Sequence, residues 1–218
     1  LVQAELRHGY IDGSFWSTAD TLRTLEGLED SRVDYRALIH PALELINGHD
    51  RDGSYDEVFG ATCAALWIRA TYLGVHAPQT QQTAKWIRSN VPRYEDRERA
   101  LAYWTLLVVG LGSSDEEALL GQILTGLDYS ALSAVDAIAY IRASIAVAHW
   151  QSCVRLLEEY ANEAKGNSWM DLATAAEGAT TCISALDALE LAGETLSATV
   201  RQKLDQTVFS AVIRIQAS

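Results

Sequence analysis

The stretch DGSYDEVFGATCAALWIRATYLG, residues 52–74, decides the fold of this chain. It opens with turn-forming residues and continues with a stripe of mostly apolar side chains spaced three and four residues apart. The positions of this stripe are Val58, Thr62, Ala65, Leu66, Arg69, Tyr72 and Leu73. Such spacing is typical of one face of a long helix, and we expect Gly74 to end it.

A second helix is predicted directly after Gly74. Pro78 suits the first turn of a helix, where its missing N–H group is not needed, and Pro92 prevents that helix from continuing. Because only a short break separates the two helices, they are expected to pack side by side as an antiparallel hairpin.

The turn that opens this hairpin recurs along the chain. Asp12-Gly13-Ser14-Phe15-Trp16 precedes a similar pattern, and Gly166-Asn167-Ser168-Trp169 is a looser copy. Aromatic residues stand at positions 15, 55, 94, 129 and 169, at intervals of 40, 39, 35 and 40 residues, each before an apolar helical pattern. A repeat of this length indicates stacked helical hairpins that bury a continuous core.

The remaining helices follow from the same periodicity. Gly112 is expected to cap the helix that starts near Glu95, and Ser114 with Glu117 forms a capping box for the next helix. Further helices are expected near residues 17–28, 34–47, 95–111, 131–149, 150–164, 171–192 and 196–214.

Sheet content is expected to be near zero, because no segment alternates apolar and polar residues over a useful length. The turn signals Asp12-Gly13 and Asp52-Gly53 are expected to lead into helices instead of strands. The predicted fold class is all-α, with about five antiparallel helical hairpins stacked as an α/α superhelix or an incomplete α/α toroid.

The repeats that start with a Gly-Ser-aromatic turn resemble those of the terpenoid cyclase and protein prenyltransferase superfamily, most clearly over residues 11–74. That resemblance implies an α/α toroid whose inner helices line a central cavity. Complete toroids of the family have six or more hairpins, so five hairpins imply an incomplete ring.

The resemblance implies no functional residue of this chain. The acidic run that triterpene cyclases use is matched only by Asp50-Arg51-Asp52-Gly53, whose last position is glycine. The zinc ligands of the prenyltransferases have no counterpart that can be matched residue by residue.

Length and composition favour one soluble, folded domain over residues 1–218. Of the 218 residues, 49% are hydrophobic and three are proline, which excludes a disordered chain, and no apolar run approaches the length of a membrane span. The chain begins at Leu1 without methionine, so we expect a fragment or domain of a longer protein.

Charge and cysteine content restrict the partners and the compartment. Seventeen basic and 29 acidic residues give a formal charge of −12, which disfavours nucleic acid and favours a basic protein or peptide partner. The widely spaced Cys63, Cys153 and Cys182 lie in apolar helical patterns. They are expected to be inert buried thiols in a reducing, cytoplasmic compartment.

The candidate catalytic residues are Asp50 and Asp52, which lie close to His49, Asp56 and Glu57. Crowded carboxylates can shift each other's pKa values and so supply an acid and a base. The alternative is that these aspartates form a turn and cap the following helix, and a magnesium or diphosphate site is a further alternative. Histidine and cysteine spacing matches no zinc motif, so neither metal nor cofactor is expected.

Aromatic side chains are the candidate ligand or partner surface. Those expected nearest the inner helices are Trp16, Tyr55, Trp67, Trp104 and Tyr140. Aromatic rings lining a cavity stabilise cations or hold apolar faces of ligands. The alternative is that they fill core volume where helices meet.

The leading functional hypothesis is a non-catalytic α-helical repeat domain that binds a protein or peptide, or that positions the domains of a larger protein. The alternative is a terpenoid cyclase- or prenyltransferase-like enzyme, or a fragment of one, with an aromatic-lined cavity and Asp50 or Asp52 as acid. A third hypothesis is a carbohydrate-active α/α-barrel enzyme with a carboxylate pair facing a tryptophan-lined cleft.

Overall fold

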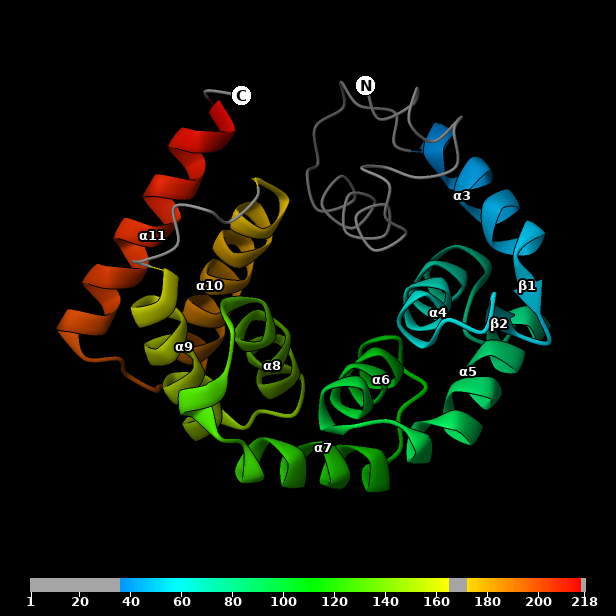
Figure 1. Cartoon of the computed structure of the whole chain (residues 1–218), viewed down its shortest axis with the longest axis horizontal. Helices are drawn as coiled ribbons and strands as arrows, with labels where there is room; N and C mark the ends of the chain where they lie inside the picture. The colour runs from blue at the N-terminus through cyan, green and yellow to red at the C-terminus, as the bar shows by residue number, and fades with distance from the viewer. Residues whose placement is uncertain (1–35, 165–171, 217–218) are drawn as a thin grey trace. The chain divides into compact units, whose positions relative to one another are not determined.

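A computed structural model describes residues 36–164 and 172–216, and helices account for most of them, which confirms the all-α fold class (Figure 1). The chain divides into two compact units, residues 1–113 and 114–218. The predicted helix near residues 17–28 and the turn at Trp16 lie outside the described residues.

The helices of the first unit surround α4. Its helices are α3 (Arg36–Gly48), α4 (Phe59–Leu73), α5 (Pro78–Asn90) and α6 (Asp96–Val108), and the 3-10 turn η1 (Val91–Arg93) follows α5. Helix α4 packs against α3, α5 and α6. Because it has neighbours on several sides, α4 is buried nearly all round, which explains why small and apolar residues fill it.

The second unit consists of α7 (Ser114–Gly126), α8 (Ala134–Ala146), α9 (Trp150–Ala164), α10 (Leu172–Ala192) and α11 (Ala198–Gln216), with the 3-10 turn η2 (Tyr129–Ala131) before α8. Helix α8 packs against α9 and α10, and α11 packs against α9 and α10. Two layers result, one formed by α8 and α10 and the other by α9 and α11.

The contacts between helices agree with most of the predicted hairpins. Three of them pair as expected within the described residues, namely α4 with α5, α8 with α9 and α10 with α11. The predicted hairpin of α6 with α7 has one helix in each unit. Closure into a toroid stays a prediction.

Helix ends confirm two predictions and correct a third. Gly74, with φ of 91°, ends α4, and Pro78 stands in the first turn of α5. Gly112 was expected to cap α6, but α6 ends at Val108 and the left-handed residue is Gly110, with φ of 76°.

The end of α6 is a Schellman motif. The Leu111 N–H group donates to Leu106 C=O at 2.9 Å, and the Gly110 N–H group donates to Leu107 C=O at 3.0 Å. Gly112 has a different role, since a Cβ atom there would lie 2.5 Å from Leu107 Cδ2. Close approach of the chain to α6, and not capping, requires glycine at this position.

The expectation that Asp52-Gly53 leads into helix without strands was wrong. Strands β1 (Asp50–Arg51) and β2 (Ser54–Tyr55) pair in antiparallel register, Asp50 opposite Tyr55 and Arg51 opposite Ser54. Asp52 and Gly53 have φ values of 52° and 95°, and positive φ at both central residues is the mark of a type I′ hairpin turn. The turn residues therefore form a short β-hairpin before α4 begins.

Candidate functional site

The predicted acidic cluster lies on the β-hairpin, beside α3, α4 and α5. Its most buried contact joins Asp50 to Arg69, whose side chain is 1% exposed. The Nη2 atom of Arg69 donates to Asp50 Oδ2 and also, at 3.4 Å, to Asn47 Oδ1. Its Nη1 atom donates to Thr83 Oγ1 at 2.6 Å. One buried cation from α4 thus holds the hairpin, α3 and α5 together.

This arrangement sets the ionisation state of Asp50. Partial burial acts to raise the pKa of the Asp50 carboxyl group, but the Gly53 N–H bond and the Arg69 guanidinium outweigh it and hold the pKa below its ordinary value. The Gly53 N–H group donates to Asp50 Oδ1 at 2.9 Å. Asp50 is therefore ionised at neutral pH, whereas a general acid must keep its proton there.

A second, more exposed contact lies on the same hairpin. The Nδ1 atom of His49 lies 2.6 Å from Asp56 Oδ2, and both side chains are more than one third exposed. The His49 ring stacks on Tyr55 with a centroid distance of 4.9 Å. Asp52 is exposed at the turn itself. The hairpin thus separates the two candidate acids, Asp50 at the buried ion pair and Asp52 at the exposed turn.

The alternative prediction, that these aspartates form a turn and cap the following helix, is correct for the turn and wrong for the cap. Asp50 accepts the turn bond from Gly53, as expected of a turn-forming aspartate. Val58, which has no side-chain acceptor, occupies the N-cap position of α4, so no aspartate does. Thr62 ties the helix start to the hairpin instead, accepting from Tyr55 N–H at 3.0 Å and donating to Val58 C=O at 2.8 Å.

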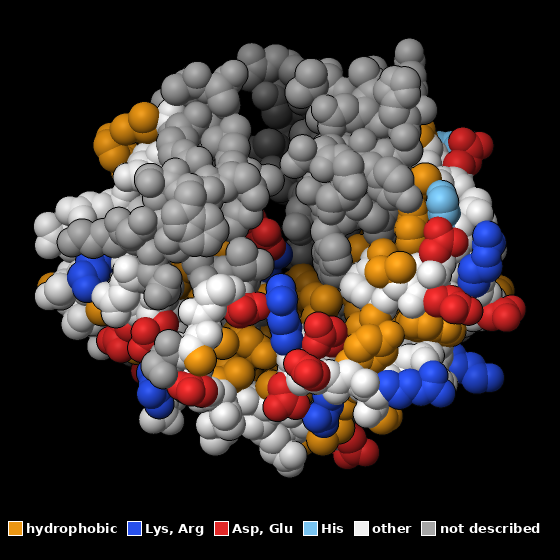
Figure 2. Space-filling view, in the orientation of Figure 1, with side chains coloured by type: hydrophobic (Ala, Val, Ile, Leu, Met, Phe, Trp, Pro, Cys, Tyr) orange, Lys and Arg blue, Asp and Glu red, His pale blue; other side chains and the backbone are white. Residues whose placement is uncertain are grey.

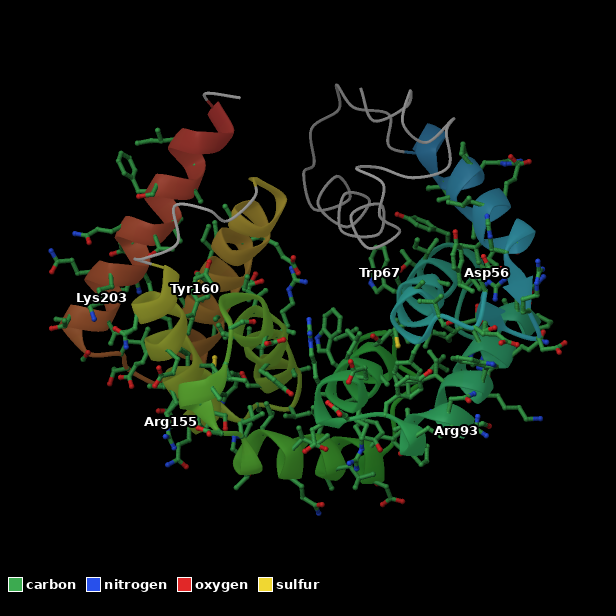
Figure 3. All side chains as sticks on the ribbon, viewed as in Figure 1. Asp56, Trp67, Arg93, Arg155, Tyr160 and Lys203 are labelled. Carbon is green, nitrogen blue, oxygen red and sulfur yellow. The ribbon has the colours of Figure 1, made fainter. Side chains whose placement is uncertain are left out.

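Most of the candidate aromatic surface is buried. Tyr55, Trp104 and Tyr140 are each at most 7% exposed, so they contribute to core packing. Trp67 is partly buried and meets Tyr72 edge to face, with ring centroids 6.4 Å apart. In Figure 3, Trp67 and Asp56 lie on opposite sides of α4. The described aromatic and acidic candidates do not converge on one site.

The three cysteines are free and buried. Burial raises the pKa of Cys63, of Cys153 and of Cys182, the last to about 12. A thiol in this state is a poor nucleophile, as the sequence predicts. No group of three possible metal-ligating side chains occurs within residues 36–164 and 172–216.

One surface feature was missed by the sequence analysis. A shallow groove of about 540 Å³ lies along the outer face of α5. We define the α5 groove by its lining residues: Gln81, Gln82, Lys85, Arg88 and Ser89. A signal for it exists in the sequence, because no Asp or Glu occurs in residues 58–94.

Comparisons with protein-family models, curated proteins and solved structures give no match to this chain. The resemblance to terpenoid cyclase repeats therefore stays a prediction. Among the helices of the described residues, none has the length and apolar character needed to cross a bilayer.

Proposed function

We propose that this chain is an α-helical repeat module that binds a protein or peptide partner and performs no chemistry of its own. The observation that carries this proposal is the pairing of Asp50 with Arg69. It leaves the candidate acid ionised and engaged with a buried cation.

The rest of the described chain supports the same proposal. The thiols are buried with raised pKa values, so they are poor nucleophiles. The outer faces of packed helices offer extended surfaces, as in other helical repeat proteins. One such surface, the α5 groove, is concave.

The test compares binding with turnover. The purified chain is titrated against a set of fluorescein-labelled peptides of uniform length, whose net charges run from acidic through neutral to basic. In parallel, it is incubated with farnesyl diphosphate, squalene and a set of oligosaccharides, and the products are measured by mass spectrometry. We expect saturable binding of at least one peptide class and no product above the buffer blank.

A matched variant makes the test sharper. Asp50→Asn removes the candidate acid, so a cyclase-like enzyme would lose its activity in this variant. Product formation by the native chain that the Asp50→Asn substitution abolishes, in a variant shown by circular dichroism to be folded, would overturn the proposal. Absence of binding to every peptide class would also overturn it.

A further inference from the structure

We infer that the α5 groove binds a carboxylate-rich peptide segment of a partner protein. The inference deepens the proposed binding function, on which it rests, by naming the partner's chemistry. It reverses the expectation of a basic partner that the net charge of the whole chain suggests.

Helix α5 presents the groove residues on one face. Gln81, Gln82, Lys85, Arg88 and Ser89 are all exposed, and they recur at three- and four-residue steps. Its other face carries the buried residues Thr80, Thr83, Ala84 and Ile87. Since α5 packs against α4 through its buried face, the groove residues stay turned outward.

The position of the groove is fixed at its hairpin end. A Cβ atom on Gly53 would lie 2.8 Å from the Gln82 backbone oxygen, so the hairpin turn rests directly on α5. At the other end, Arg88 Nη2 donates to Leu111 C=O at 2.5 Å, which holds that guanidinium in place. The backbone of α5 and the Arg88 guanidinium are therefore positioned before a partner binds, which lowers part of the entropy cost of binding.

The charge of this surface is opposite to that of the chain. The chain carries a formal charge of −12, yet residues 58–94 contain no carboxylate side chain. Lys85, Arg88 and Arg93 are exposed within that span. Lys and Arg side chains gather beside α5 on the face shown in Figure 2. Along the chain, exposed carboxylates flank this span at both ends, with Asp56 and Glu57 before it and Glu95 and Asp96 after it.

A short peptide fits this surface better than a nucleic acid does. Exposed charges act over a Debye length of about 8 Å at physiological ionic strength, so a short segment senses mainly the local cations. An extended polyanion would also meet the acidic remainder of the chain and be repelled. The Gln82 amide offers donors and acceptors suited to a peptide backbone, and the Gln81 amide, whose Nε2 atom donates to Val75 C=O at 2.6 Å, offers its carbonyl oxygen as an acceptor.

The length of the α5 groove and the spacing of its cations indicate how long the bound segment is and how its carboxylates are spaced. The groove runs from Gln81 to Ser89, about 12 Å at 1.5 Å per helical residue, which matches three to four extended residues at about 3.3 Å each. Lys85 and Arg88 are neighbours on the helix, with Cβ atoms about 5–6 Å apart. Two carboxylates on alternate residues of an extended segment, about 6–7 Å apart, match that separation.

The probe is a fluorescein-labelled peptide that alternates glutamate with leucine, compared with a matched peptide in which glutamine replaces glutamate. We expect the glutamate peptide to bind the full chain and the glutamine peptide to bind at least fivefold more weakly. Raising the salt concentration should weaken binding of the glutamate peptide, because exposed ion pairs are screened. A single-stranded oligonucleotide and inorganic phosphate serve as competitors, and neither should displace the peptide at equal charge concentration.

Lys85→Glu tests the groove, and Lys203→Glu is its control. Both variants change the net charge equally, but Lys203 lies on α11 in the other unit, where it bonds to Asn162. Reversing one exposed charge beside bound carboxylates should weaken peptide binding roughly fivefold to tenfold in Lys85→Glu. Lys203→Glu should change it less than twofold. Thermal melts of both variants establish that each is folded.

The outcomes separate this inference from the proposed function. If neutral or basic peptides bind and the glutamate peptide does not, the groove inference is overturned while the proposed function stands. If no peptide binds, both fall. Equal weakening in the two variants, or displacement by the oligonucleotide, would also contradict an acidic peptide site on α5.

Discussion

Asp50 on β1 accepts a hydrogen bond from the almost fully buried guanidinium of Arg69 on α4. The two ends of this ion pair have different access to water, since the Arg69 side chain is 1% exposed and the Asp50 side chain is 27% exposed. Removing one partner therefore has a different consequence from removing the other.

Asp50→Asn should destabilise the fold more than Arg69→Met. Loss of Asp50 leaves a buried cation without its counter-ion, which costs roughly 3 kcal/mol or more. Loss of Arg69 leaves a carboxylate that water can reach, and methionine fills much of the vacated volume. The double variant should recover part of the loss of Asp50→Asn. Urea unfolding of the four proteins measures this cycle.

The control for that cycle is Asp205→Asn. It removes the exposed pair of Arg201 and Asp205, whose side chains are both more than half exposed. Such a pair contributes little, so the free energy of unfolding should change by less than about 0.5 kcal/mol. Equal losses in Asp50→Asn and Arg69→Met would contradict the asymmetry.

The effect of Asp50→Asn should depend on pH. The pKa of the Asp50 carboxyl group is lowered in the folded chain from its ordinary value of 3.8. A lowered folded pKa means that the carboxylate stabilises the fold above the unfolded pKa, and that this contribution is lost as pH falls through the folded pKa. The difference in unfolding free energy between the native chain and the variant should therefore be full at pH 7 and shrink below pH 3.8. Urea titrations across this range measure it; a constant difference would show that Asp50 does not act through its charge.

The sequence predicts most helices well because their signals are local. Pro78 and Gly74 mark ends that backbone geometry alone dictates, and apolar spacing marks the helices between such ends. The sequence did not predict the β-hairpin, because each of its strands is only two residues long and too short to show an alternating pattern. The prediction that Gly112 caps α6 was wrong because two nearby glycines have different roles. Gly110 adopts the positive φ that ends the helix, and Gly112 allows the chain to pass close to Leu107.

The candidate site was less predictable than the fold. Arg69 belongs to the stripe that predicts α4, and its burial follows from that position. Its pairing with Asp50 joins residues 19 apart in the chain, and helical spacing predicts only contacts between residues three or four apart. The α5 groove depends on the absence of acidic residues over a long span, a signal that motif searching does not detect.

Gly178→Ala should destabilise the second unit, although alanine is the better helix former. A Cβ atom at Gly178 on α10 would lie 2.0 Å from Tyr160 Oη and 3.2 Å from Ile138 Cδ1. Tyr160, labelled in Figure 3, is 1% exposed, so its ring cannot move away without repacking the side chains around it. Overpacking of this kind costs roughly 1–3 kcal/mol, more than the gain of about 1 kcal/mol in helix propensity.

Gly121→Ala is the matched control for that substitution. Gly121 is also inside a helix of the second unit, but nothing lies within 4 Å of a Cβ atom there. It should therefore gain roughly 0.5–1 kcal/mol from helix propensity alone. Opposite signs in urea unfolding are expected for the two variants. Adding Tyr160→Phe to Gly178→Ala should restore part of the loss, because it removes the atom in closest contact.

Ala148→Gly should stabilise the chain. Ala148 has φ of 51° at the end of α8, in a Schellman motif where His149 N–H donates to Ser144 C=O at 2.8 Å and Ala148 N–H donates to Ile145 C=O at 3.1 Å. The equivalent position after α6 is Gly110, and after α10 it is Gly193. The left-handed conformation costs a residue with a Cβ atom roughly 1–2 kcal/mol, and glycine loses more entropy on folding, so a net gain of roughly 0.5–1 kcal/mol remains.

In a chain of 218 residues a gain of this size raises the melting temperature by roughly 1–4 °C, which calorimetry resolves. The control is Ala118→Gly, at an exposed position within α7, where the same change of residue should cost up to about 1 kcal/mol because ordinary helical φ favours alanine. The sign of the effect thus depends on φ alone, since both substitutions remove one methyl group. A lower melting temperature in Ala148→Gly would mean that the methyl group of Ala148 contributes more through packing than its left-handed backbone costs.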